Sequence, residues 1–268
     1  MASMLLGSMG MGQPRFFAVA LRTVFAMSLV GCTVDADDSR FVDDDDTRDG
    51  MTGKGDIIGQ DDLIPVQEDG ANIPSRYRHV LDAIGLIEFR VNGKRFHCTG
   101  THIGDGVMLT AGHCFKEFGV SADTVLAQSL EKGSCIVHWG VRSIEGGYLE
   151  SDCTVLLGAK FVVNGIDAAV VEVSPAPSAR VELARTQVAD GSRVTIFSHP
   201  RGRTLEWSQT CRLRYGELYS GFYHLCDTEP GSSGAAVLDY ATLTIVGIHN
   251  AGLDTRNRAT VMFNGFEF

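Results

Sequence analysis

The chain has 268 residues, of which 44% are hydrophobic, and its 23 basic and 33 acidic residues give a net charge of −10. This composition provides enough chain for one well-buried domain or two small lobes, and excludes a wholly disordered protein. The negative charge argues against nucleic acid as a partner, but residues 33–72 carry all of it, with 13 acidic and 3 basic residues.

Residues 1–31 are expected to be an export signal of the lipoprotein type. Arg15 and Arg22 accompany an apolar run that is too short and too interrupted for a transmembrane helix. The run ends in Leu-Val-Gly-Cys at residues 29–32, which resembles the bacterial lipobox, where the cysteine is lipidated. We therefore expect a cell-envelope lipoprotein of the outer membrane, anchored through Cys32. The alternative is that Cys32 is a spare thiol in an ordinary signal and that the protein is secreted.

Residues 32–72 are predicted to form an acidic, disordered linker. They are rich in Asp and Gly, poor in aromatic residues, and lack any periodic apolar pattern. Such a segment buries too little surface to offset the entropy lost on ordering. The four aspartates at 43–46 do not begin an EF-hand loop, because Arg48 and Lys54 occupy the positions that require Gly and Glu. The folded domain is expected to span residues 73–268.

From residue 80 onward the apolar segments are short, rich in β-branched residues, and bounded by turn-forming residues. Many short strands without a sustained helical period predict an all-β sandwich or barrel. Pro175 and Pro177 suit a connector between lobes at about 80–174 and 179–268. Strands are predicted at 85–91, 107–110, 135–139, 168–173, 193–198, 235–239, 243–248 and 259–263.

Seven cysteines fit an exported protein if one of them is lipidated, because the remaining six can then form disulfides. Pairing of sequential neighbours is the simplest arrangement, although six cysteines allow fifteen pairings. The simplest pairs are Cys98 with Cys114, Cys135 with Cys153, and Cys211 with Cys226.

Three motifs carry candidate chemistry. Residues 110–114 read Thr-Ala-Gly-His-Cys and place His113 at the end of a predicted strand. Asp167 lies at the start of another, where a carboxylate can be buried and still accept a hydrogen bond from an imidazole. Ser233 follows a Gly-rich turn, and the amides of Gly231 and Ser233 could point at one oxyanion. Taken singly, each motif has a structural explanation: a disulfide loop, a strand-initiating aspartate, and a hairpin.

Together the motifs give the chain order His113, Asp167, Ser233. This order differs from that of α/β-hydrolases and subtilisins, and it matches the trypsin-like arrangement. On these motifs, residues 73–268 resemble the trypsin-like serine peptidases of the chymotrypsin clan, and most closely the bacterial V8-like glutamyl endopeptidases. The resemblance implies an all-β fold of two six-stranded antiparallel β-barrels, with the active site in the cleft between them.

The resemblance also implies a specificity pocket, about which two features disagree. His249 and Thr228 are similar to V8-like residues that favour an acidic substrate side chain at P1, the residue before the scissile bond. Asp227, however, lies six residues before Ser233, where trypsin-type enzymes place an aspartate that selects Arg or Lys. The V8-like context of the motif favours the acidic preference.

The expected function is a secreted serine endopeptidase that works through an acyl-enzyme, with His113 as base, Asp167 orienting it, and the Gly231 and Ser233 amides binding the oxyanion. No metal or cofactor is implied. The expected partner is a protein or peptide substrate, with no nucleic acid, and with membrane contact only through a lipid on Cys32; the protein is expected to be monomeric. The alternative is a lipid-anchored, non-catalytic binding module with a peptidase-like fold.

Overall fold

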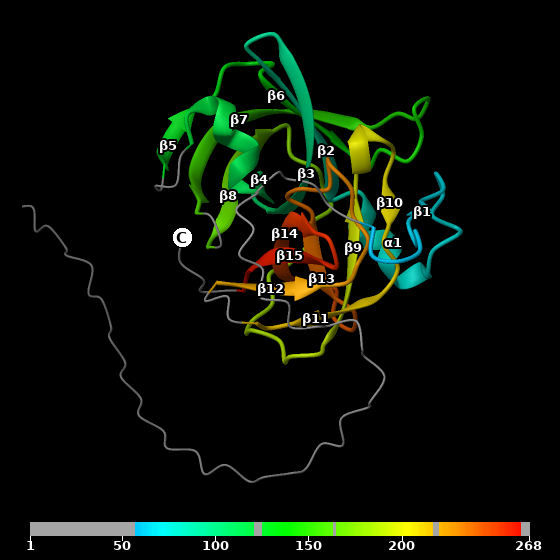
Figure 1. Ribbon diagram of the computed structural model, residues 1–268. Helices are drawn as coiled ribbons and strands as arrows, with labels where there is room; N and C mark the ends of the chain where they lie inside the picture. The colour runs from blue at the N-terminus through cyan, green and yellow to red at the C-terminus, as the bar shows by residue number, and fades with distance from the viewer. Residues whose placement is uncertain (1–56, 121–124, 163–164, 217–219, 264–268) are drawn as a thin grey trace, which may run out of the picture. The chain divides into compact units, whose positions relative to one another are not determined.

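The computed structural model describes residues 57–120, 125–162, 165–216 and 220–263, which form two antiparallel β-barrels (Figure 1). The predicted export signal, Cys32 and the linker up to residue 56 lie outside the described residues. The described helical elements are short: η1 (Ser75–Tyr77), α1 (Arg78–Leu81), η2 (Gly112–Phe118) and η3 (Pro200–Gly202). In the described ranges, no helix has the length and apolar character needed to cross a membrane.

The first barrel is a closed ring with the strand order β7-β6-β2-β3-β4-β8, and pairing of β7 with β8 closes it. The remaining strand, β5, adds to the edge of β7. β8 ends immediately before the predicted connector prolines. The strands are β2 (Ile84–Val91), β3 (Lys94–Gly104), β4 (Val107–Thr110), β5 (Val125–Ser129), β6 (Cys135–Trp139), β7 (Leu149–Phe161) and β8 (Asp167–Ser174).

The second barrel is closed in the same way, in the order β9-β11-β12-β15-β14-β13, by pairing of β13 with β9. β10 and β1 extend the sheet beyond β9, so β1, the first strand in the described residues, adds to the sheet of the second barrel (Figure 1). The strands are β9 (Arg193–Ser198), β10 (Glu206–Trp207), β11 (Cys211–Arg214), β12 (Gly221–His224), β13 (Ala236–Asp239), β14 (Ile245–Leu253), β15 (Arg256–Val261) and β1 (Ile64–Pro65).

The predicted fold class of two six-stranded antiparallel barrels is confirmed. Every strand predicted from the sequence overlaps an observed one, although β14 starts two residues later than predicted and continues to Leu253. Seven observed strands were not predicted. They are β1, β3, β5, β7, β10, β11 and β12.

The linker prediction is wrong for residues 57–72, which follow a defined path over the second barrel. β1 pairs with β10, and the amide of Val66 donates to the carbonyl of Leu205 at 2.9 Å. Val66 is only 2% exposed. The prediction was made from the acidic composition of residues 32–72 as a whole and overlooked the short apolar stretch at 63–66. This stretch gains enough burial and hydrogen bonding from the barrel to be ordered.

The three predicted disulfides are all present: Cys98–Cys114, Cys135–Cys153 and Cys211–Cys226. The second cross-links β6 and β7, and the third joins the first residue of β11 to the segment that follows β12. The first joins β3 to η2 and lies beside the cleft between the barrels. Pairing of sequential neighbours therefore ties short local loops and adds rigidity where the chain approaches the candidate site.

Candidate active site

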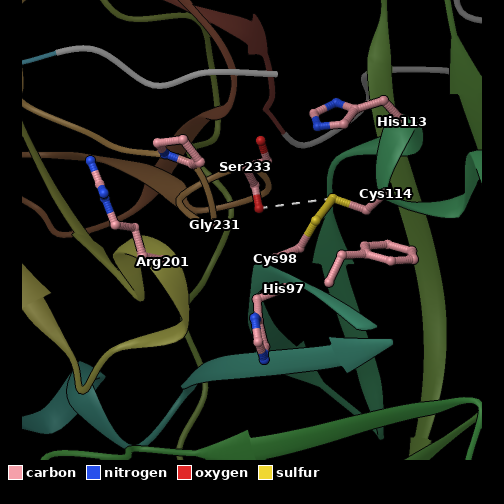
Figure 2. A pocket seen from close by; sticks show the side chains of 9 residues that line it. His97, Cys98, His113, Cys114, Arg201, Gly231 and Ser233 are labelled. Carbon is pink, nitrogen blue, oxygen red and sulfur yellow. Dashed lines mark hydrogen bonds between the residues drawn. A yellow bond between two sulfur atoms is a disulfide. The ribbon is translucent and has the colours of Figure 1, made fainter. Parts of the chain in front are cut away.

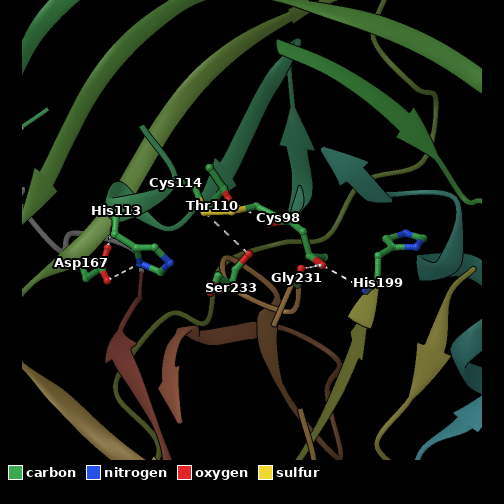
Figure 3. The surroundings of a disulfide bond; sticks show 9 residues. Cys98, Thr110, His113, Cys114, Asp167, His199, Gly231 and Ser233 are labelled. Carbon is green, nitrogen blue, oxygen red and sulfur yellow. Dashed lines mark hydrogen bonds and ion pairs between the residues drawn. A yellow bond between two sulfur atoms is a disulfide. The ribbon is translucent and has the colours of Figure 1, made fainter. Parts of the chain in front are cut away.

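His113 and Asp167 meet because neighbouring strands of the first barrel present them at the same end. His113 lies in η2, directly after β4, and Asp167 is the first residue of β8, the strand paired with β4. The fully buried Asp167 carboxylate contacts Nδ1 of His113 at 2.7 Å through Oδ2, and accepts the His113 backbone amide at 2.9 Å through Oδ1 (Figure 3). Two contacts from one carboxylate fix both the ring and the backbone of the histidine.

The backbone of Asp167 is held in turn by the second barrel. The Asp167 amide donates to Oγ1 of Thr260 in β15 at 2.9 Å, and the Thr260 hydroxyl lies 3.2 Å from the Asp167 carbonyl. Nδ2 of Asn250 also donates to Thr260 Oγ1, at 2.8 Å. Thr260 and Asn250 are therefore positioning residues that the sequence analysis did not identify, because they are remote in sequence from Asp167.

Ser233 lies in a tight turn before β13 that requires glycine on both sides. Gly231 and Gly234 have φ values of +101° and +89°, which are in the left-handed range that favours glycine. A Cβ at Gly234 would lie 2.0 Å from Oγ1 of Thr110, and a Cβ at Gly231 would lie 2.8 Å from the carbonyl of His199. The Gly-Ser-Ser-Gly motif is thus a consequence of close backbone packing between the turn and both barrels.

Thr99 in β3 connects this turn to the first barrel. Its amide donates to the carbonyl of Ser233 at 2.8 Å, and its hydroxyl donates to the carbonyl of Gly231 at 2.9 Å. The same hydroxyl accepts the His199 amide at 3.0 Å. Thr99 is fully buried, and it follows Cys98, whose disulfide lies beside the turn (Figure 3). Thr99 is a third positioning residue that no local pattern indicated.

A cavity of about 440 Å³ opens at this junction, and both His113 and Ser233 line it. Figure 2 shows the His113 ring pointing toward Ser233, with the disulfide between Cys98 and Cys114 below them in the view. Within the described ranges, no hydrogen bond joins His113 to Ser233, a separation common in peptidases without substrate. The predicted residues His113, Asp167, Gly231 and Ser233 are therefore gathered at one site.

The amides of Gly231 and Ser233 are available at the same turn. Among the described residues, neither amide donates to a backbone or side-chain acceptor. Ser232, which lies between them, donates its amide to the Glu229 carbonyl at 2.9 Å. Two free donors on either side of Ser232 can stabilise an oxyanion that forms next to the hydroxyl of Ser233.

His249 forms a buried pair with His224 of β12 within the second barrel. Nε2 of His224 lies 3.2 Å from Nδ1 of His249, and both side chains are fully buried. Burial lowers the pKa of His224 to about 3; burial and the neighbouring His224 and His113 hold the pKa of His249 well below its usual value. Both imidazoles are therefore neutral at pH 7.

Two polar atoms of the predicted specificity residues have no protein partner. Nε2 of His249 and Oγ1 of Thr228 are buried and make no hydrogen bond within the part of the chain that the structure describes. Buried polar atoms are usually paired, so these two unpaired atoms are candidates for contact with a ligand, although neither Thr228 nor His249 lines the cavity that contains His113 and Ser233. They offer hydrogen bonds without carrying a charge of their own.

Asp227 is also buried, but its carboxylate is already engaged. Oδ1 accepts the amide of Ile58 and Oδ2 accepts the amide of Asp62, each at 2.7 Å. Desolvation raises the pKa of Asp227, these two hydrogen bonds lower it, and the nearby Asp61 and Asp62 raise it, with a net increase.

Cys211, His224 and Cys226 have ligand atoms within 4.8 Å of one another. The two cysteines are joined in a disulfide, so neither supplies the thiolate that zinc requires. This cluster therefore does not form a metal site.

Comparison with known proteins gives one family match and many structural matches. The model of the trypsin-like peptidase domain matches residues 98–248. A search of curated protein sequences finds no match. A solved structure titled "Structure of Glu endopeptidase in complex with MPD" is 21% identical with a TM-score of 0.56, and the match covers 78% of this chain and 95% of that one.

Two further solved structures are similar at a lower level. A thermostable serine protease AL20 from an extremophilic microorganism is 14% identical with a TM-score of 0.50, covering 68% of this chain and 92% of that one. The Rv3671c protease from M. tuberculosis, in its active form, is 16% identical with a TM-score of 0.50, covering 74% and 83%. At these identities the structural matches establish the shared fold alone.

Proposed function

The chain belongs to the trypsin-like peptidase family, and from this premise we propose that it is a serine endopeptidase with His113, Asp167 and Ser233 as its catalytic residues. The observation that carries the proposal is the double contact of the buried Asp167 carboxylate with the ring and backbone of His113, beside a cavity lined by Ser233. A buried carboxylate that orients an imidazole stabilises the imidazolium formed when the histidine takes a proton.

In the proposed reaction, Nε2 of His113 takes the proton of Ser233 as the serine oxygen attacks the substrate carbonyl. The oxyanion is stabilised by the amides of Gly231 and Ser233. His113 then gives the proton to the leaving amine, and an acyl-enzyme remains. Water, deprotonated by the same histidine, attacks the ester and releases the acid and the free serine.

Labelling with a fluorophosphonate probe tests this assignment and the alternative of a non-catalytic binding module. We expect wild-type protein to be labelled and both Ser233→Ala and His113→Ala to lose labelling. Thr242→Ala is a matched control, because Thr242 lies in an exposed turn of the second barrel. An unlabelled wild-type protein, or equal labelling of Ser233→Ala, would exclude Ser233 as the nucleophile.

We also propose that the enzyme prefers an acidic residue at P1. The proposal is supported by the unpaired polar atoms of His249 and Thr228, and by the engagement of both Asp227 carboxylate oxygens with backbone amides. Because His249 is neutral, it contributes a hydrogen bond, and its donation from Nε2 requires His224 to donate to Nδ1. Matched peptides with Glu, Gln and Lys at P1 test this; faster cleavage after Lys would refute it.

Export and lipidation at Cys32 remain part of the proposal on sequence grounds alone. The supporting feature is the Leu-Val-Gly-Cys sequence at residues 29–32. Mass spectrometry of the N-terminal peptide from cell envelopes should find a lipid on Cys32 and no residues before it. An unmodified N-terminal peptide in the culture medium would favour the secreted alternative.

A further inference from the structure

The N-terminal strap, defined here as residues 57–66, packs against the second barrel (Figure 1). Its strand β1 pairs antiparallel with β10, and Gln209 donates its side-chain amide to the carbonyl of Asp62 at 3.0 Å. These contacts lie at the edge of the sheet and hold the first half of the strap, residues 57–62, at its last residue, Asp62.

Asp227 is the group that holds this first half. The amides of Ile58 and Asp62 each donate to a different oxygen of its carboxylate at 2.7 Å. The Asp227 side chain is nearly inaccessible, with 3% exposure. Hydrogen bonds to an ionised group are stronger than neutral ones. These two bonds are therefore the principal polar attachment between the strap and residues 227–228. We call the paired contact the strap clamp.

The strap clamp leaves Asp227 poorly suited to bind a basic substrate side chain. Both oxygens are occupied by backbone donors that are separated from Asp227 by 169 and 165 residues in sequence. Among the described residues, Asp227 forms no ion pair with a lysine, arginine or histidine. A substrate lysine would have to displace two short hydrogen bonds from a carboxylate that solvent hardly reaches.

The position of Asp227 in the chain connects the strap to the active site. Thr228 follows it immediately, and the turn that carries Ser233 begins three residues later. That turn is fixed independently, because Thr99 binds the carbonyls of both Gly231 and Ser233. A loss of the strap clamp should therefore act on the residues next to Asp227 more than on the nucleophile.

We propose that Asp227 is a positioning residue that clamps the N-terminal strap, and that the clamped strap shapes the pocket that binds the P1 side chain. The proposal rests on the serine endopeptidase function inferred above. In this proposal, the backbone amides of residues 58 and 62 bind the Asp227 carboxylate. In enzymes with a free aspartate at this position, a basic substrate side chain binds that carboxylate instead. The strap is thus part of the structure that determines substrate affinity.

The test compares Asp227→Ala, Asp227→Asn and Ile58→Pro with wild type in the full chain. Ile58→Pro removes one donor of the strap clamp and leaves Asp227 intact. Asp69→Asn is the matched control, since Asp69 is an exposed acid just after the strap whose carboxylate accepts the Ala71 amide at 2.9 Å. Two readouts are measured: hydrogen exchange of residues 58–62, and kcat and KM for a peptide with Glu at P1.

The strap clamp predicts that exchange in residues 58–62 rises about tenfold or more in Asp227→Ala and in Ile58→Pro. KM should rise about tenfold, with kcat changing by less than about threefold. Asp227→Asn, which keeps one acceptor oxygen, should show a smaller change, and Asp69→Asn should match wild type. A merely structural role would lower kcat and the labelling of Ser233 together, and would not separate KM from kcat.

Unchanged exchange in Asp227→Ala, or a selective loss of cleavage after Lys and Arg, would overturn the proposal and assign Asp227 to substrate binding. If the wild-type protein cleaves no peptide, the endopeptidase function fails, while the exchange measurement still decides whether Asp227 holds the strap.

Discussion

Thr99 allows a quantitative test of how the two barrels hold the nucleophile turn. Replacing it with valine keeps the side-chain volume but removes the hydroxyl that bonds the Gly231 carbonyl at 2.9 Å and the His199 amide at 3.0 Å. Thr99 is fully buried, so water cannot replace the lost contacts. Each buried polar group left without a partner costs about 1 to 3 kcal/mol. The expected loss in the free energy of unfolding for these two groups is therefore about 2 to 6 kcal/mol.

The activity should fall as well, because the Gly231 carbonyl belongs to the turn that positions Ser233. A displacement of about 1 Å of catalytic groups can lower rates by about a hundredfold, so we expect kcat/KM to fall by about 10- to 100-fold. Urea unfolding and peptide hydrolysis measure the two effects. The control is Thr99→Ser, which keeps the hydroxyl, loses one methyl group, and should cost only about 1 kcal/mol.

Two outcomes would refute this reasoning about Thr99. One is a Thr99→Val variant whose stability lies within about 0.5 kcal/mol of wild type and whose activity is intact. The other is a Thr99→Ser variant that loses as much as Thr99→Val, which would assign the effect to packing of the methyl group.

The remaining predictions concern cross-linking, acid sensitivity and the glycine turn. Replacing both Cys135 and Cys153 with alanine should lower the free energy of unfolding by about 3 kcal/mol, since this disulfide spans 18 residues; an unchanged urea midpoint would contradict this. The pKa values of buried His199 and His224 are lowered to about 4 and about 3, mainly by desolvation, so below pH 6.5 only the unfolded state takes up their protons. Stability should thus be full above pH 6.5 and fall by about 2 kcal/mol per histidine between pH 7 and 5. His199→Asn should make that decrease about 2 kcal/mol smaller in urea titrations at the two pH values. Gly231→Ala should abolish fluorophosphonate labelling, because the added Cβ would meet backbone atoms at 2.8 Å; normal labelling would show that the turn can shift.

Some of the strands could be predicted from the local sequence, and others could not. The predicted strands are those with continuous β-branched or apolar residues, such as β8, in which a run of Ala and Val is buried. β3 was missed because its first residues are Lys and Arg and its buried centre contains Thr99 and Thr101. These threonines are buried because β3 is central in the first barrel and close to the second, which a local pattern does not reveal.

The sequence by itself determined the chemistry and its order along the chain. The motifs around His113, Asp167 and Ser233 indicated a nucleophile, a base and an orienting carboxylate, and the even set of six cysteines indicated sequential disulfides, which the structure contains. Local patterns are sufficient here because each motif is a strand end or turn whose geometry depends on adjacent residues.

Only the tertiary structure decided which residues hold that chemistry in place. Thr99 reaches Gly231 over 132 residues, Thr260 reaches Asp167 over 93, and Asp227 reaches the strap over more than 160. The sequence left Asp227 between two substrate preferences, whereas the structure directs its carboxylate to two backbone amides. Such contacts depend on how two barrels and a preceding strap pack together, and hydrogen bonds between groups so far apart in the chain leave no periodic or local signal.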